Sequence, residues 1–273
     1  MIQDIYPSRF NNNYKAESPK ADDTVLVFDE EGKVFADIRD HGIAFTTAEQ
    51  IRAQLPVYLF SIDDRSYFLA PSGDHDIPEG FEAYSLRQLR SSSCITGLFA
   101  AFTAFHLWKW YNDNRFCGCC GEKMTADTSE RALKCEACGN VVYPRINPAV
   151  IVGVINGDSL LITRYRRGYG HNALIAGFVE IGETLEQTVA REVSEEAGIR
   201  VKNIRYYASQ PWGMASDLLA GFFCELDGDE NIRMDEGELK YAQWTKREDI
   251  ELQPGGDISL TNEMMRMFKE GKV

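Results

Sequence analysis

Four cysteines in the middle of the chain constrain its fold more than any other feature. They form two Cys-x2-Cys pairs separated by 14 intervening residues: Cys117, Cys120, Cys135 and Cys138. Thiolates at this spacing can surround one tetrahedral zinc ion. The segment 116–145 has too few apolar residues to form a core, so a bound metal ion is needed to stabilise its fold. A closed four-thiolate site leaves no position for substrate, and we predict a structural zinc.

The remaining three of the seven cysteines are assigned to other roles. Cys119 lies between the two cysteines of the first pair. It is left out of the ligand set because the two pairs then match as Cys-x2-Cys-Gly, with Cys120 and Cys138 each followed by glycine. Cys94 and Cys224 lie in apolar runs and are predicted core residues. The odd count and the absence of an apolar export segment near the N-terminus favour metal binding over disulfides and predict a cytoplasmic protein.

Length and composition predict a soluble globular protein of two or three compact units. The chain has 273 residues, 44% apolar and 26% charged, and a formal net charge of -13. Such a surface repels phosphate backbones, which argues against non-specific nucleic-acid binding. The most hydrophobic run, Cys94–Trp108, is short for a membrane span. It predicts a helix that is buried in the core or packed in a dimer.

Sequence patterns divide the chain into a small N-terminal α/β domain (1–112), a zinc ribbon (113–145) and a C-terminal domain (146–273). In the first domain, Thr24–Phe28 and Val57–Ile62 are predicted strands. In the third, Asn156-Gly157 lies between two β-rich runs and predicts a hairpin. Further predicted elements are strands at Ala173–Val179, Arg205–Ser209 and Leu218–Leu226 and a closing helix over 259–271.

A predicted helix over Leu185–Ala197 carries three glutamates in its last turns, Glu192, Glu195 and Glu196. Negative charge is disfavoured at that end of a helix dipole, by roughly 0.3–1 kcal/mol for each group. Taken alone, an acidic helix face is typical of a solvated surface. The same carboxylates beside the apolar stripe of the helix suit Mg²⁺ or Mn²⁺, which prefer oxygen ligands and are commonly shared with substrate phosphates.

The spacing around this helix resembles the Nudix box, G-x5-E-x7-R-E-U-x-E-E-x-G-U, where U is apolar. Every fixed position matches over Gly177–Ile199. The resemblance implies a Nudix hydrolase domain, an α/β/α sandwich with a mixed sheet that binds divalent metals and splits nucleoside diphosphate derivatives.

The order of the three segments resembles the NADH pyrophosphatases, a family with a zinc ribbon before the Nudix domain. That family carries Ser-Gln-Pro-Trp-Pro-Phe-Pro after the box. Here Ser209-Gln210-Pro211-Trp212 is followed by Gly213-Met214-Ala215. The departure removes a ring that could stack on a base, so the preference for reduced nicotinamide is open. The implied reaction is NAD(H) plus water giving NMN(H) and AMP, in a homodimer with a dinucleotide substrate.

The resemblance also implies roles for single residues. The expected catalytic residues are Glu183, Arg191, Glu192, Glu195, Glu196 and Glu238. The expected Mg²⁺ or Mn²⁺ ligands are Glu192, Glu195, Glu196, Glu238 and the backbone carbonyl of Ala176. The expected substrate contacts are Arg87, Glu130, Tyr143, Phe178, Ser209, Gln210, Pro211 and Trp212, with a core position as the alternative for Phe178. The general base stays open between Glu192 and Glu238, with Arg191 orienting the carboxylates.

Two alternative functions remain. The first is a Nudix hydrolase of ADP-ribose, a dinucleoside polyphosphate or an NAD-capped RNA end. The second is a nucleotide-sensing module that binds without cleaving. The intact set of acidic residues argues for the enzyme.

Overall fold

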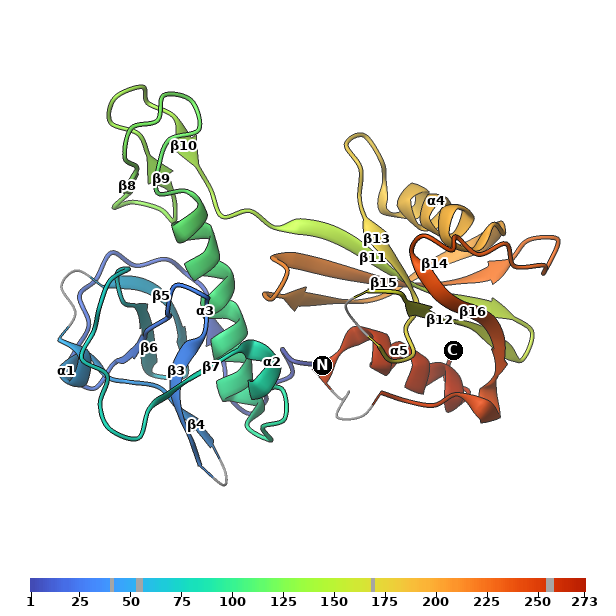
Figure 1. Ribbon diagram of the computed structural model, residues 1–273, viewed down its shortest axis with the longest axis horizontal. Coiled ribbons are helices and arrows are strands. Elements are labelled where there is room, and N and C mark those ends of the chain that lie inside the picture. Colours follow the sequence, from blue (N-terminus) through green and yellow to red (C-terminus); the bar gives the residue numbers. More distant parts are fainter. Residues whose placement is uncertain (40–41, 53–55, 168–169, 254–257) are drawn as a thin grey trace. The chain divides into compact units, whose positions relative to one another are not determined.

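The computed structural model of the chain describes residues 1–39, 42–52, 56–167, 170–253 and 258–273 (Figure 1). It divides into two units. The C-terminal unit consists of Met1–Ile2, Ile146–Pro211 and Asp217–Val273. The N-terminal unit consists of Gln3–Arg145 and Trp212–Ser216.

The C-terminal unit is built on a mixed sheet with the strand order β14-β15-β11-β12-β16, and β13 also pairs with β11. Its strands are β11 (Asn147–Asn156), β12 (Ser159–Tyr165), β13 (Ile175–Phe178), β14 (Val201–Trp212), β15 (Asp217–Leu226) and β16 (Leu239–Lys246). The central strand β11 is parallel to β15 and antiparallel to β12 and β13. The predicted hairpin turn is confirmed, with Gly157 in the left-handed region at φ 57°.

One helix covers each face of this sheet (Figure 1). Side chains of β11 alternate between the faces, as expected for a strand buried on both sides. Helix α4 (Leu185–Ala197) packs Val189 and Val193 against one face. Helix α5 (Leu260–Lys269) packs Met264 and Phe268 against the other, after the short turn η1 (Arg247–Asp249). The predicted α/β/α sandwich is confirmed.

Before the cysteine segment, the described part of the N-terminal unit contains two small sheets, with strand orders β1-β5-β6-β2 and β4-β3-β7. Its strands are β1 (Phe10–Asn11), β2 (Thr24–Leu26), β3 (Val34–Arg39), β4 (Gly42–Ala44), β5 (Val57–Ile62), β6 (Arg65–Leu69) and β7 (Glu82–Tyr84). Its helices are α1 (Ala48–Ile51), α2 (Leu86–Leu89) and α3 (Ile95–Asp113). The small α/β domain and both of its predicted strands are therefore present.

Helix α3 is the apolar run singled out in the sequence, and it packs inside its own unit. Phe99 meets Phe10 edge to face at 4.9 Å between ring centroids. Trp108 stacks on Phe28 at 5.3 Å. Core packing accounts for its apolar character, and dimerisation stays a prediction. Within the described residues, no helix is both long and apolar enough to cross a membrane.

The cysteine segment folds as a three-stranded ribbon with the order β10-β9-β8. Its strands are β8 (Thr125–Ala126), β9 (Leu133–Lys134) and β10 (Val141–Val142). Arg131 of this ribbon donates hydrogen bonds to Asn12 and to the carbonyl of Leu59. Tyr14 donates to the carbonyl of Asp127 at 3.0 Å. These bonds join the ribbon to β5 and to the segment that follows β1 in the N-terminal unit.

Candidate active site and metal centre

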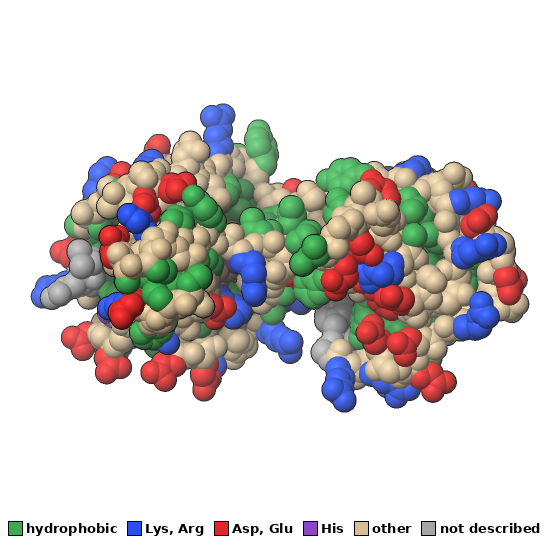
Figure 2. Space-filling view, turned by 90° about the horizontal axis from the view of Figure 1, so that it is seen from above, with side chains coloured by type: hydrophobic (Ala, Val, Ile, Leu, Met, Phe, Trp, Pro, Cys, Tyr) green, Lys and Arg blue, Asp and Glu red, His purple; other side chains and the backbone are tan. Residues whose placement is uncertain are grey.

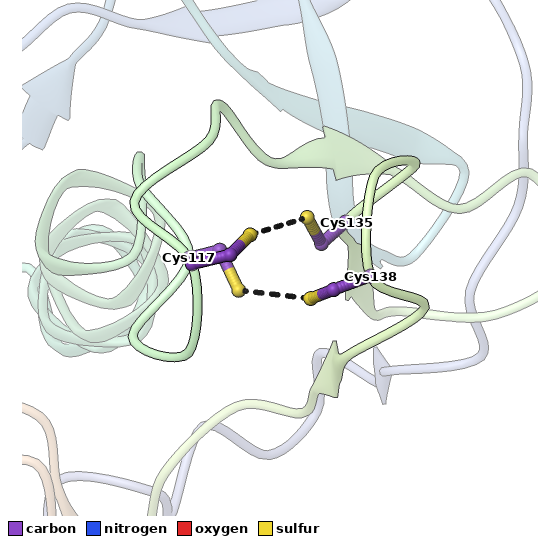
Figure 3. Close-up of side chains that lie close together, drawn as sticks. Cys117, Cys135 and Cys138 are labelled. Carbon is purple, nitrogen blue, oxygen red and sulfur yellow. Dashed lines mark hydrogen bonds between the residues drawn. The ribbon is translucent and has the colours of Figure 1, made fainter.

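The four predicted cysteines converge within the ribbon. Figure 3 shows three of them, Cys117, Cys135 and Cys138, with their side chains turned toward one another. Their sulfur atoms lie within 4.8 Å of one another, with 3.6 Å between Cys117 and Cys138 and 3.5 Å between Cys120 and Cys135. Sulfurs bound at 2.3 Å to a tetrahedral zinc ion are about 3.8 Å apart, so the donors fit the ion. In the described part of the chain, this is the one group of three or more His, Cys, Asp or Glu ligand atoms gathered so closely.

Each half of the cluster is a tight turn closed by a glycine. The backbone N–H of Gly121 donates to the carbonyl of Cys117, and that of Gly139 donates to Cys135, both at 2.9 Å. The φ angles of these glycines, 81° and 77°, lie where a side chain is disfavoured. Backbone N–H groups, led by that of Cys119, lower the pKa of the Cys117 thiol to about 6, which favours the thiolate that a metal binds.

Helix α4 begins and ends where the sequence predicts. The Thr184 hydroxyl accepts the N–H of Gln187, and the Gln187 side chain accepts the N–H of Thr184 at 2.8 Å. At the other end, Gly198 adopts φ 67° and donates its N–H to Ser194. These caps fix which helical face carries each glutamate.

Arg191 is the cation that joins most of the box carboxylates. Its guanidinium contacts Glu183 at 2.7 Å, Glu192 at 2.8 Å and Glu195 at 2.9 Å. It also donates to the carbonyl of Phe178 at 2.9 Å. The hydrogen bonds from Arg191 lower the pKa of Glu183 to about 2. Glu183 therefore stays ionised and ties the box loop to α4.

Glu196 is the carboxylate that Arg191 does not reach. Only 2% of the residue is exposed, and within the described part of the chain no lysine or arginine forms an ion pair with it. Burial, followed by the charges of Glu192 and Glu238, raises its pKa to about 8. A buried carboxylate among like charges, without a cation, is where a divalent ion would be stabilised most.

The other two α4 glutamates lie in different surroundings. Glu192 is partly buried, and burial raises its pKa. The Glu195 side chain is 60% exposed. Glu238 is exposed and is the last residue of the turn before β16, where its carbonyl accepts the N–H of Arg166 at 2.9 Å.

Tyr165, at the end of β12, belongs to this site although sequence reasoning did not select it. Its hydroxyl lies 3.3 Å from both carboxylate oxygens of Glu196 and accepts the N–H of Ala176 at 3.0 Å. Burial raises its pKa, so the hydroxyl keeps its proton at neutral pH. The position lies 12 residues before Gly177, where the box begins, and nothing local in the sequence marks it.

Gly177, the first residue of the box, lies against the carboxylate of Glu192. A Cβ at this position would be 2.0 Å from both Cδ and Oε1 of Glu192. The requirement for glycine here is therefore spatial, because a side chain would occupy the place of the carboxylate.

We expect Gly177→Ala to lower turnover by about 10²-fold while changing thermal stability little. The flexible end of Glu192 can move aside, but a displacement of about 1 Å at a reacting centre has an effect of this size. Steady-state kinetics and a thermal melt would check both parts. Gly170→Ala, which adds a methyl group with nothing within 4 Å, is the matched control. A variant with wild-type turnover would contradict the packing argument.

We also expect the metal-free protein to lose stability between about pH 4.5 and pH 8 through Glu196. The unfolded carboxyl releases its proton near 4.5 and the folded one near 8. Between these two values the folded chain binds a proton that the unfolded chain releases. The contribution of this proton to the free energy of unfolding is therefore complete below pH 4.5 and is lost as the pH rises toward 8. Glu196→Gln should raise the Tm at pH 8 by about 2–8 °C, which corresponds to a gain of about 1–2 kcal/mol in the free energy of unfolding. The same variant should make the Tm less dependent on pH. Melts without metal would test this, with the exposed Glu186→Gln as control.

The Ser209–Trp212 motif is divided between the two units. Ser209 and Pro211 are exposed near the end of β14. Gln210 is fully buried, donating to the carbonyl of Ile258 and accepting the N–H of Leu260, both at 2.7 Å. Its amide therefore fixes the start of α5. A substrate role for these residues stays a prediction.

Residues Trp212–Ser216 belong to the N-terminal unit. The Trp212 ring meets Phe102 of α3 edge to face at 5.3 Å, and the Arg90 guanidinium lies 5.4 Å from its centroid. A Cβ at Gly213 would be 2.0 Å from the carbonyl oxygen of Phe102. Close approach to α3 leaves no room there for proline, which gives a physical reason for the departure from the family motif.

The remaining predicted substrate contacts lie on the surface. Phe178 is 54% exposed, so a core position does not account for it. In the N-terminal unit, Tyr143 donates to Glu130 at 2.9 Å, and Arg87 is exposed on α2. The structure brings Tyr143 and Glu130 together, and the binding roles of all four residues stay predictions.

Comparison with known proteins agrees with the fold and with the four-cysteine ribbon. Residues 145–266 match the NUDIX domain, and residues 112–143 match the NADH pyrophosphatase zinc ribbon domain. An NAD-capped RNA hydrolase NudC from Klebsiella pneumoniae is 44% identical over 174 residues, 62% of this chain and 66% of the relative. Proteins of that name from Salmonella typhi and Escherichia coli are also 44% identical, each over 58% of this chain and 62% of the relative. The matches thus span slightly less than two thirds of these relatives.

The sandwich and its glutamate-bearing helix define a Nudix domain. Together with the four-cysteine ribbon, they show that the chain belongs to the Nudix hydrolases that carry an NADH pyrophosphatase zinc ribbon.

Proposed function

We propose that this protein hydrolyses the pyrophosphate bond of NAD(H) to NMN(H) and AMP, using Mg²⁺ or Mn²⁺. The observation that carries the proposal is Glu196, a buried carboxylate beside Glu192 and Glu238 without a cationic partner among the described residues. The family match and the relatives named for NAD-capped RNA support the same bond as the target.

In this proposal, the residues of the site have different roles in metal binding, proton transfer and substrate binding. The two or three divalent ions would be held by Glu192, Glu195, Glu196, Glu238 and the Ala176 carbonyl. Bound divalent ions supply Lewis acidity, which lowers the pKa of water and screens phosphate oxygens. Glu192 or Glu238 accepts the proton of the attacking water, and Arg191 holds Glu192 and Glu195 in place. The exposed ring of Phe178 offers an apolar face to a base.

NAD-capped RNA ends are the second candidate, because the named relatives act on them. Hydrolysis at a cap needs the same site, since the bond is the same. The net charge of -13 gives no long-range attraction for the RNA chain. Acidic side chains, coloured red, are scattered over both units on the face seen in Figure 2, with basic ones among them. Free NAD(H) is therefore the substrate we favour.

Product chromatography on a substrate panel tests the proposal. NADH, NAD⁺, ADP-ribose, a dinucleoside polyphosphate and an NAD-capped oligonucleotide would each be incubated with Mg²⁺ and then Mn²⁺. We expect equal amounts of NMN(H) and AMP from NAD(H). Cleavage of another panel member but not of NAD(H) would overturn the assignment. Tight nucleotide binding without any product would support a sensing module instead.

A further inference from the structure

The Tyr165 hydroxyl joins two groups of the proposed metal site that are far apart in sequence. It accepts the backbone N–H of Ala176 at 3.0 Å and lies 3.3 Å from each oxygen of Glu196. The carbonyl oxygens of Ala176 and Leu174 are slightly farther, at 3.4 Å. A phenol has a single proton to donate. Once ionised, the Glu196 carboxylate is a stronger acceptor than either carbonyl, so Glu196 is then the preferred partner.

The sheet explains why a tyrosine at this position can reach α4. Residues alternate along β12, so Tyr165 faces the same side as Leu161, which packs in the core under α4. The pairing of β12 with β16 shifts at this point: Arg164 is opposite Tyr241, whereas Tyr165 is opposite Leu239. The irregularity brings the end of β12 next to Glu238, the residue before Leu239. Such bulges redirect side chains next to functional sites.

The Ala176 peptide is held from the same side. Ala176 pairs with Ile151 on β11, yet its N–H and its carbonyl both lie within 3.4 Å of the Tyr165 hydroxyl. One hydroxyl thus sets the position of a carboxylate on α4 relative to a carbonyl on β13. Without it, the buried Glu196 would lose a donor, and the Ala176 N–H would lose one of its two acceptors and keep only the Glu196 carboxylate.

We propose that Tyr165 is a positioning residue that holds Glu196 and the Ala176 peptide in the arrangement that receives the divalent ion. The inference rests on the proposed metal-dependent hydrolysis and adds a residue outside the Nudix box to it. Groups that orient metal ligands typically change metal affinity by 10–100-fold when they are removed. Tyr165→Phe keeps the ring in the core and removes only the hydroxyl.

The test is a titration of the full-length, zinc-loaded protein with Mn²⁺ in the absence of nucleotide, followed by electron paramagnetic resonance of the free ion. We expect Tyr165→Phe to bind Mn²⁺ about tenfold more weakly than wild type. Tyr241→Phe is the matched control, because it removes a hydroxyl from the opposite face of the same strand pair. Mn²⁺ affinity of Tyr165→Phe within about twofold of wild type would overturn the proposal.

A second measurement separates positioning from a general effect on folding. In a Glu196→Gln background, Tyr165→Phe should weaken Mn²⁺ binding by less than about twofold, because the carboxylate that it positions is gone. An equal loss in both backgrounds would contradict a role through Glu196. Since no nucleotide is present, either result holds whether or not NAD(H) is the substrate.

Discussion

Glu192→Gln is expected to lower the turnover of NAD(H) by at least about 10³-fold, with the fold intact. The carboxylate lies 2.8 Å from Arg191 and fills the space above Gly177, so an amide of the same shape fits there. The amide carries no charge for a divalent ion and cannot accept the proton of the attacking water. A loss of this size corresponds to about 4 kcal/mol of transition-state stabilisation.

The matched control for this experiment is Glu186→Gln, which removes one charge from an exposed position in the first turn of the same helix. We expect it to keep wild-type turnover. Kinetics at saturating Mg²⁺ and at saturating Mn²⁺ would measure both variants. A Glu192→Gln enzyme that stays within about tenfold of wild type would remove Glu192 from the catalytic set.

Cys135→Ser is expected to release zinc and unfold the ribbon. Cys135 is fully buried, and the apolar cluster around it contains few other residues, among them Trp110 and Leu133. Structural zinc contributes about 10–16 kcal/mol in zinc-finger peptides, far more than such a small core can supply. Elemental analysis should fall from about one zinc per chain to almost none. Limited proteolysis should then cut within 112–143.

Cys119→Ser is the control that makes this result specific. Cys119 is exposed and lies outside the cluster of four, so the variant should keep its zinc and its resistance to protease. Equal zinc loss in both variants would mean that the ligand set has been assigned incorrectly. Retention of zinc by Cys135→Ser would mean the same.

Local sequence signals predicted the elements that carry the site. The capping box at Thr184 and the glycine at Gly198 set the limits of α4, and the structure has the helix between them. The cysteine spacing likewise predicted four converging sulfurs. The helix limits and the cysteine turns both depend on hydrogen bonds between residues that are close in the sequence. Such local bonds form independently of the tertiary surroundings of the segment.

Longer-range features were missed or predicted only in part. Strand β16 was not predicted, because Leu239 is its one fully buried residue and the apolar alternation is weak. Strand β14 runs from Val201 to Trp212, well beyond the predicted Arg205–Ser209, because pairing with a neighbour supports residues of low intrinsic strand preference.

The sequence by itself determined which acidic residues share one helix, and the spacing of cysteines that can enclose a zinc ion. Tertiary structure alone decided that Glu196 is buried while Glu195 is exposed, and that Tyr165 reaches Glu196 from another strand. The reason is that burial and the pKa of a carboxylate depend on what packs against it. Those neighbours come from β12, β13 and β16, and their position is set by pairing across the sheet, not by separation along the chain.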